Sequence, residues 1–249
     1  MTRARLLAAV LASGLLAGCT SATGTSRAEV STALSPRVSS PSVVPYSSAT
    51  PLPHRFHATI GEVPSELVAQ MRGTTWRPGC PLPISSLRLL SFRYWGYDGR
   101  VHEGPMVVNA SVASGLASVF RELFRARFPI KHVALARRFR PNADPNTTRS
   151  ITASFNCRPI VTPAGAGSTW SQHAYGLAVD VNPLQNPYVA ADGYVRNRFA
   201  RPYRDRSQDL PGMIHDGDPV VRAFAAIGWE WGGHWSSGKD YMHFSANGN

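Results

Sequence analysis

The stretch SQHAYGLAVDVNP, residues 171–183, places a histidine and an aspartate seven positions apart around an apolar run. Taken as a strand, LAVDV (177–181) turns its three aliphatic side chains to one side and Asp180 to the other, because strand side chains alternate. Gly176 permits a turn just before this strand, so His173 can fold back toward Asp180. A buried charge without a partner is costly. Both residues are therefore expected to be paired, hydrogen-bonded or bound to a metal ion.

A second stretch, DYMHFS (240–245), has the same alternation and places His243 where it can meet His173 and Asp180 across neighbouring strands. Two imidazoles and one carboxylate are a suitable ligand set for a catalytic zinc ion, with the fourth position left for water. Asp240 lies three residues before His243, in the expected turn that enters the strand. Its carboxylate could act there as a general base without binding the metal.

The remaining pattern predicts an α+β domain. Three helices are expected, at residues 66–72, 110–128 and 219–227, with Ser65, Asn109 and Asp218 as their N-caps. Strand-like runs lie between them at 105–108, 132–139, 152–156, 177–181 and 241–245. Because the strands and helices do not alternate regularly, the sheet is expected to be mainly antiparallel and flanked by helices.

Two spaced motifs carry a family resemblance: S-x-H-x-x-G-x-A-x-D at 171–180, and W-x-W-G-G-x-W at 229–235 followed by D-x-x-H-F at 240–244. With them the chain resembles the LAS-type zinc metallopeptidases, in the branch of D-alanyl-D-alanine carboxypeptidases and L-alanyl-D-glutamate endopeptidases. The resemblance covers roughly residues 78 to 246. It implies a single domain of the hedgehog/DD-peptidase-like fold.

The resemblance also implies roles for individual residues. His173, Asp180 and His243 would bind Zn²⁺, and Asp240 would be the catalytic acid/base. Some relatives have glutamate in place of Asp240, so the shorter aspartate arm needs a closer approach or a different water geometry. Arg158 matches an arginine that holds the substrate carbonyl or the developing oxyanion, a physically reasonable role for a cation. The alternative for Arg158 is a surface ion pair.

Two further residues are candidate substrate-binding residues. Ser171 could orient a ligand or cap a turn. Trp231 could present a flat surface to a sugar, or pack beneath the site with the other tryptophans of its motif. His234 stands inside this motif where relatives often have an acidic residue, and the sequence assigns it no role.

The N-terminus predicts export. Residues 1–18 combine two arginines with an apolar run too short to span a bilayer, which is typical of a signal peptide. The sequence LAGC at 16–19 resembles a bacterial lipobox, so Cys19 is expected to carry a lipid; the alternative is an ordinary signal cut nearby. Residues 19–53, rich in Ser, Thr and Pro, are expected to form a disordered tether. Residues 54–249 would form one peptidase domain.

The two other cysteines, Cys80 and Cys157, are expected to form a disulfide, because exported chains tend to be oxidised. The alternative is a catalytic thiolate at Cys157. Its neighbours Arg158 and Pro159 do not suggest the helix N-terminus that would activate such a group.

The chain carries a formal net charge of +11, mostly from arginine, which attracts polyanions. No aromatic-interleaved basic motif or zinc-finger spacing supports nucleic acid as the partner. The expected place is outside the cytoplasm, with the chain lipid-anchored to the bacterial membrane, facing the cell wall, as a monomer. The basic surface could equally be no more than a solvated one.

The expected function is hydrolysis of an amide bond in the stem peptides of peptidoglycan, by carboxypeptidase or endopeptidase action. The alternative is a non-catalytic wall-binding lipoprotein that keeps the fold. A serine hydrolase is not supported, because the chain has no G-x-S-x-G motif.

Overall fold

The structure is a computed structural model of the 249-residue chain and describes residues 52–136, 148–162 and 165–248. These residues belong to one compact unit that begins at Ala49. The predicted signal peptide (1–18), Cys19 and all but the end of the predicted tether (19–53) lie outside the described residues. Within the described ranges, no helix combines the length and apolar character needed to cross a membrane.

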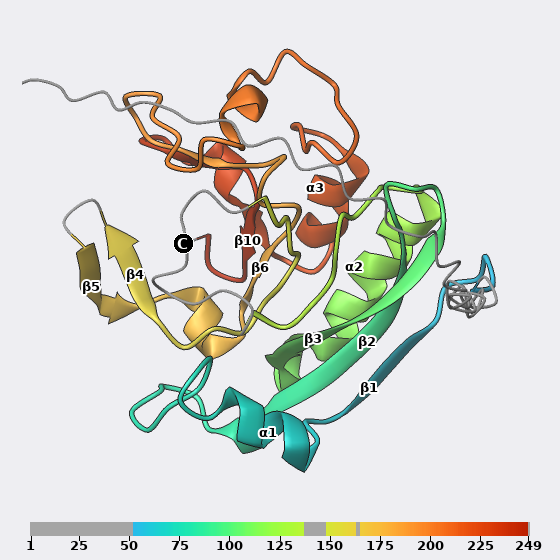
Figure 1. The fold of residues 1–249 in the computed structure, drawn as a ribbon, viewed down its shortest axis with the longest axis vertical. Helices are drawn as coiled ribbons and strands as arrows, with labels where there is room; N and C mark the ends of the chain where they lie inside the picture. The colour runs from blue at the N-terminus through green and yellow to red at the C-terminus, as the bar shows by residue number, and fades with distance from the viewer. Residues whose placement is uncertain (1–51, 137–147, 163–164, 249) are drawn as a thin grey trace, which may run out of the picture. The chain divides into compact units, whose positions relative to one another are not determined.

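The larger sheet has three antiparallel strands in the order β1-β2-β3 (Figure 1). They are β1 (Ala58–Glu62), β2 (Leu87–Trp95) and β3 (Val101–Asn109). Strands β2 and β3 pair without interruption from Leu87 opposite Asn109 to Trp95 opposite Val101. Leu90, Phe92 and Tyr94 are buried at alternate positions of β2. One face of this sheet therefore packs on the core.

The smaller sheet has the order β6-β10-β8 and is also antiparallel. It consists of β6 (Ala178–Asp180), β10 (His243–Ser245) and β8 (Glu230–Trp231). Two further strand pairs are antiparallel: β4 (Pro159–Thr162) with β5 (Gly165–Trp170), and β7 (Tyr188–Val189) with β9 (Lys239–Asp240).

The described residues also form three α-helices: α1 (Ser65–Met71), α2 (Ala113–Arg125) and α3 (Pro219–Ala225). Short 3₁₀ turns are η1 (Ile84–Ser86), η2 (Ala110–Val112), η4 (Gln172–Tyr175), η5 (Arg201–Arg204) and η6 (Gly232–His234). Helix α2 lies along the larger sheet beside α3 (Figure 1). Two stacked ring pairs join the layers: Phe92 with Phe120 at 3.9 Å, and Phe224 with Phe244 at 4.0 Å between centroids. The core thus lies between the helices and both sheets.

The predicted α+β class with antiparallel sheets is confirmed, and all three predicted helices form. Helices α1 and α2 start at other residues than predicted, whereas α3 starts at Pro219 as predicted and ends earlier. Ser65 is the first residue of α1, and Pro64 takes the cap position. Asn109 caps η2, where its Oδ1 accepts from the amide of Ser111, and α2 starts later. Asp218 does hold the cap position of α3, but its carboxylate accepts from the amide of His215 instead of a helix amide.

Two predicted strands are wrong. Residues 132–136, the described part of the run 132–139, form no strand, and neither do residues 152–156. Val133 and Thr152 share one isolated bridge, and Ala153 makes another with Asp180. Val133 and Ala136 of the first run and Ala153 and Phe155 of the second are buried, but the described residues of each run form only isolated bridges. Burial, not strand pairing, explains their composition.

The predicted disulfide is present between Cys80 and Cys157, with a Cα–Cα distance of 5.9 Å and a sequence separation of 77. The thiolate alternative for Cys157 is therefore wrong. In the chain-entropy account, closing a loop of this length stabilises the fold by about 4 kcal/mol. The amide of Cys157 also donates to the carbonyl of Thr75 at 2.8 Å. Both bonds fix the chain immediately before Arg158.

Candidate metal and catalytic site

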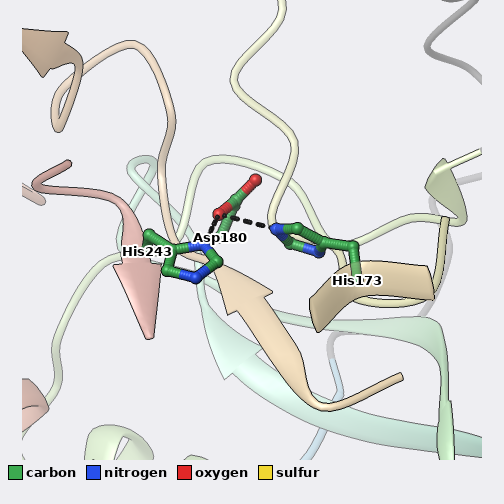
Figure 2. Close-up of side chains that lie close together, drawn as sticks. All are labelled: His173, Asp180 and His243. Carbon is green, nitrogen blue, oxygen red and sulfur yellow. Dashed lines mark hydrogen bonds and ion pairs between the residues drawn. The ribbon is translucent and has the colours of Figure 1, made fainter. Parts of the chain in front are cut away.

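Three side chains from separate elements meet at one point, as Figure 2 shows. The antiparallel register of β6 and β10 sets His243 directly opposite Asp180. Oδ1 of Asp180 lies 3.1 Å from Nδ1 of His243 and 3.2 Å from Nε2 of His173. The carboxylate therefore sits between the two imidazoles, whose ring centroids are 5.1 Å apart.

His173 reaches this point because the chain turns sharply around it. Ser171 caps η4, and its Oγ accepts from the amide of His173 at 3.3 Å. Gly176 ends the turn with a φ of 64°, in the left-handed region that favours glycine. The carbonyl of Gly176 accepts from the amide of Asn109 at 3.1 Å. The end of β3 thus holds the turn that carries His173.

The tautomer of His173 follows from its contacts. Its Nδ1 lies 2.8 Å from the carbonyl oxygen of Ser154, which can only accept, so Nδ1 carries the hydrogen. Its Nε2 is buried and makes no hydrogen bond to any described residue, although the carboxylate of Asp180 lies close by. Two acceptor atoms that face each other need a proton or a cation between them. A metal ion would satisfy both.

The charge of Asp180 suits this role. Burial alone would raise the pKa of its carboxyl, but the interactions with the nearby His173 and with His243, whose Nδ1 is hydrogen-bonded to Oδ1, outweigh burial. The pKa of Asp180 is consequently held well below its usual range, and the group is an anion at neutral pH. A carboxylate in this state is ready to bind a cation.

The spacing of the donor atoms fits a small divalent ion. One donor atom from each of the three residues lies within 4.8 Å of the others. Ligand bonds of about 2.0–2.2 Å in a tetrahedron place neighbouring donors about 3.4 Å apart. The observed 3.1 and 3.2 Å separations are close to that value. With two separations near this value and the third within 4.8 Å, these residues can hold a metal ion.

Asp240 lies beside this cluster, on β9, and is not part of the ligand set. Its Oδ1 is buried without a hydrogen-bond partner among the described residues. Burial and the charge of Asp180 raise the pKa of Asp240 to about 7, while His243 and Arg158 act in the opposite direction. A Cβ on Gly232 would lie 2.6 Å from the carbonyl oxygen of Asp240. Glycine is needed there for the close approach.

Arg158 is half-buried and acts on Asp240 electrostatically, and its Nη1 donates to the carbonyl of Pro159 at 3.2 Å. The structure therefore places this arginine at the site, joined to the disulfide through its neighbour Cys157. Its predicted contact with the substrate stays a prediction.

The two candidate substrate-binding residues are both buried. Ser171 is 6% exposed and caps η4, as described above. Trp231 is 4% exposed, and its Nε1 donates to the carbonyl of Tyr241 at 2.9 Å. Its position fits the packing alternative better than contact with a sugar. His234 is exposed and pairs with Asp216 at 2.9 Å.

Several residues that shape the site escaped sequence reasoning. The carbonyl of Ser154 orients His173, and a backbone carbonyl has no sequence signature. Asn109 donates from Nδ2 to the carbonyl of Tyr175 at 3.0 Å, but the sequence suggested only a helix cap. Arg206 lies 4.4 Å from the ring centroid of Tyr241, next to Asp240, and no motif pointed to it.

Replacement of Gly176 by alanine should disturb this site more than the same replacement would at an ordinary glycine in the left-handed region. Strain from the positive φ costs about 1–2 kcal/mol. The new Cβ would also lie 2.6 Å from the amide nitrogen of Asn109, a backbone atom that cannot move aside. We therefore expect urea denaturation to show a loss of unfolding free energy larger than this strain energy alone. We also expect the variant to bind metal more weakly than the parent.

Gly228→Ala is the matched control. Gly228 has a similar φ of 78°, but nothing lies within 4 Å of the added Cβ. This variant should lose only the strain energy and keep its metal affinity. Equal losses of stability in the two variants would show that the contact with Asn109 does not position η4.

The fold and the site together define a class of protein: an α+β domain with a candidate metal centre and an adjacent buried carboxylate. Residues 164–246, a third of the chain, match the family model described as D-alanyl-D-alanine carboxypeptidase. This segment contains all three candidate ligands and Asp240, and the match confirms the family resemblance found in the sequence motifs. No curated protein and no solved structure matches the chain.

Proposed function

We propose that the protein is a zinc-dependent peptidase that hydrolyses an amide bond in peptidoglycan stem peptides, as a D-Ala-D-Ala carboxypeptidase or an L-Ala-D-Glu endopeptidase. One observation carries the proposal: His173, Asp180 and His243 converge beside the buried carboxylate of Asp240, whose Oδ1 has no hydrogen-bond partner among the described residues, inside the segment that matches the carboxypeptidase family. Histidine and carboxylate ligands are typical of catalytic zinc sites.

The residues of the site divide the chemistry among them. A zinc ion held by the three ligands would supply a Lewis acid that polarises the scissile carbonyl and acidifies water. Asp240 takes the proton of the attacking water and returns it to the leaving amine. In the chain without a bound metal ion, burial and the charge of Asp180 raise the pKa of Asp240 to about 7, and an acid/base group works best near the ambient pH. Arg158 balances the negative charge that develops on the carbonyl oxygen.

The proposed setting is the space between the bacterial membrane and the cell wall, with the chain held by a lipid on Cys19 and acting as a monomer on the peptide. The disulfide supports an oxidising compartment, because such bonds are rare in the cytosol. The lipid and the signal peptide rest on the sequence motif alone.

Digestion of purified peptidoglycan by the full chain tests the proposal. We expect release of D-alanine, or cleavage between L-alanine and D-glutamate, when the products are identified by mass spectrometry. A chelator should stop the release and added zinc should restore it, because the three ligands hold the ion that the reaction needs. Binding to the wall without any released product would instead favour the non-catalytic wall-binding lipoprotein.

A further inference from the structure

A cleft of about 570 Å³ lies at the opposite end of the larger sheet from the candidate metal site. It is formed by the end of β2, the last turn of α2 and the chain before β1. Strand β3 runs from the cleft to the candidate metal site. Its first residue, Val101, pairs with Trp95 in the cleft wall, and its last residue, Asn109, contacts the turn η4 that carries His173. At about 3.4 Å per residue, these two ends of β3 are roughly 27 Å apart. The cleft is therefore distinct from the site already described.

Four arginines and four rings line the cleft, which we call the arginine–aromatic cleft: Arg55, Arg121, Arg125, Arg127, His54, Phe56, Trp95 and Phe124. No acidic residue of the described chain is among the lining residues. Glu122 lies next to them and pairs with Arg125 at 2.7 Å. The guanidinium groups of the other three arginines make no ion pair with a described carboxylate.

The rings hold two of these guanidinium groups in place. Arg121 lies over the ring of Phe56 at 5.7 Å, and Arg127 lies over Trp95 at 4.9 Å. The rings themselves are packed: Trp95 contacts Phe124 with a centroid distance of 5.5 Å, and its Nε1 donates to the carbonyl of Phe124. Cation–π contacts of this kind restrain a side chain without neutralising its charge. The cleft therefore presents positioned, uncompensated cations.

Arg127 also occupies a strained backbone position, which makes its side chain notable. Its φ is 53°, in the left-handed region where a helix end commonly has glycine. The residue comes directly after Ala126, the C-cap of α2, so glycine would satisfy the backbone better. An arginine at this place contributes its guanidinium group to the cleft wall at a cost in backbone energy.

We propose that the arginine–aromatic cleft binds a phosphate ester. A guanidinium group matches phosphate oxygens with two parallel hydrogen bonds, and a phosphate offers oxygens to more than one guanidinium at once. A single carboxylate offers only two oxygens to the arginines around the cleft. The aromatic walls provide apolar surface for the carbon part of the ester. The ester could belong to a soluble molecule or to a lipid head group, and the chemistry is the same.

The test compares two double variants of the full chain, both carrying Cys19→Ser so that no lipid is attached. The cleft variant is Arg121→Gln with Arg127→Gly, in which glycine relieves the strained φ. The control is Arg72→Gln with Arg77→Gln. It removes the same charge from exposed positions outside the cleft, including one arginine that lies over a tryptophan, Trp76.

The probes are glycerol 3-phosphate and phenyl phosphate in calorimetry, and vesicles of pure phosphatidylglycerol or pure phosphatidylcholine in sedimentation. For a soluble source, the parent and the control bind the two esters alike, and the cleft variant binds them at least about tenfold more weakly. If the ester belongs to a lipid head group, the cleft variant binds phosphatidylglycerol vesicles more weakly than the parent and the control do. The soluble esters then show no such difference between the proteins. Equal binding by the cleft variant and the control, or no binding by the parent, would overturn the proposal.

Thermal unfolding of each variant checks that its fold is intact, and Arg121→Gln alone serves if the double cleft variant does not fold. Arg121 is exposed, so its replacement leaves the core unchanged. The single variant should still bind the phosphate ester more weakly than the control does. Unchanged binding would count against the cleft. Peptidase activity enters none of these measurements, so the result is independent of the proposed function.

Discussion

Replacement of Asp180 by asparagine is expected to remove metal binding and, with it, peptidase activity. Asparagine keeps the shape of the side chain but loses the charge that lies between His173 and His243. Substitution of residues that only contact a ligand typically weakens metal affinity by 10–100-fold. Loss of a ligand's own charge should therefore weaken zinc binding by more than about 100-fold, with release of product falling in parallel.

Zinc affinity is measured by competition with a chromogenic chelator, and activity by the released amino acid. Asp98→Asn is the matched control, because Asp98 also pairs with a histidine, His102, at 2.9 Å, but on an exposed turn. The control should retain both properties. An Asp180→Asn protein that binds zinc as tightly as the parent would show that the three residues do not form the metal site.

The site was more predictable than the fold around it, for a physical reason. The alternation of strand side chains, applied to residues 177–181 and 241–245, was enough to place Asp180 and His243 on one face. The structure has them as direct partners in the register. Gly176 indicated the turn that brings His173 close to Asp180. Each of these inferences uses local geometry, which depends only on neighbouring residues.

The long-range features could not be predicted in the same way. Strand β2 (Leu87–Trp95), which is central to the larger sheet, was not predicted, although Leu90, Phe92 and Tyr94 alternate within it. The sequence predicts strands at 132–139 and 152–156, but the described residues of these runs make only isolated bridges. Their buried side chains pack in clusters with residues of distant segments, and local pattern does not reveal which segments those are. The arginine–aromatic cleft likewise joins residues far apart in the sequence.

Replacement of Asp240 by asparagine is expected to lower kcat by about 10²–10⁴-fold, the usual contribution of a general acid/base. Asp240 lies outside the ligand set, so the variant should bind zinc as the parent does. Asparagine can still hydrogen-bond a water molecule but cannot take its proton. The expected result is therefore a zinc-loaded, folded and nearly inactive protein.

The same substitution should remove a pH dependence of stability. The ordinary pKa of an aspartate is about 3.9, and in the folded chain burial and Asp180 raise that of Asp240 to about 7. Between these values the folded chain holds a proton that the unfolded chain has lost. This group therefore lowers the unfolding free energy as pH rises from about 4 to 7. Urea denaturation of chelator-treated proteins should show Asp240→Asn gaining stability relative to the parent across that range.

Asp240→Glu separates the chemistry of the carboxylate from its position. Glutamate restores the proton acceptor on a longer arm, so kcat should recover above that of Asp240→Asn, as far as the space beside Gly232 allows. A purely structural role for Asp240 would give the reverse order, because asparagine matches the aspartate volume and glutamate does not. Should Asp240→Asn bind zinc and cleave at the parent rate, the proton would have to move through another group, and Asp240 would lose its place in the reaction.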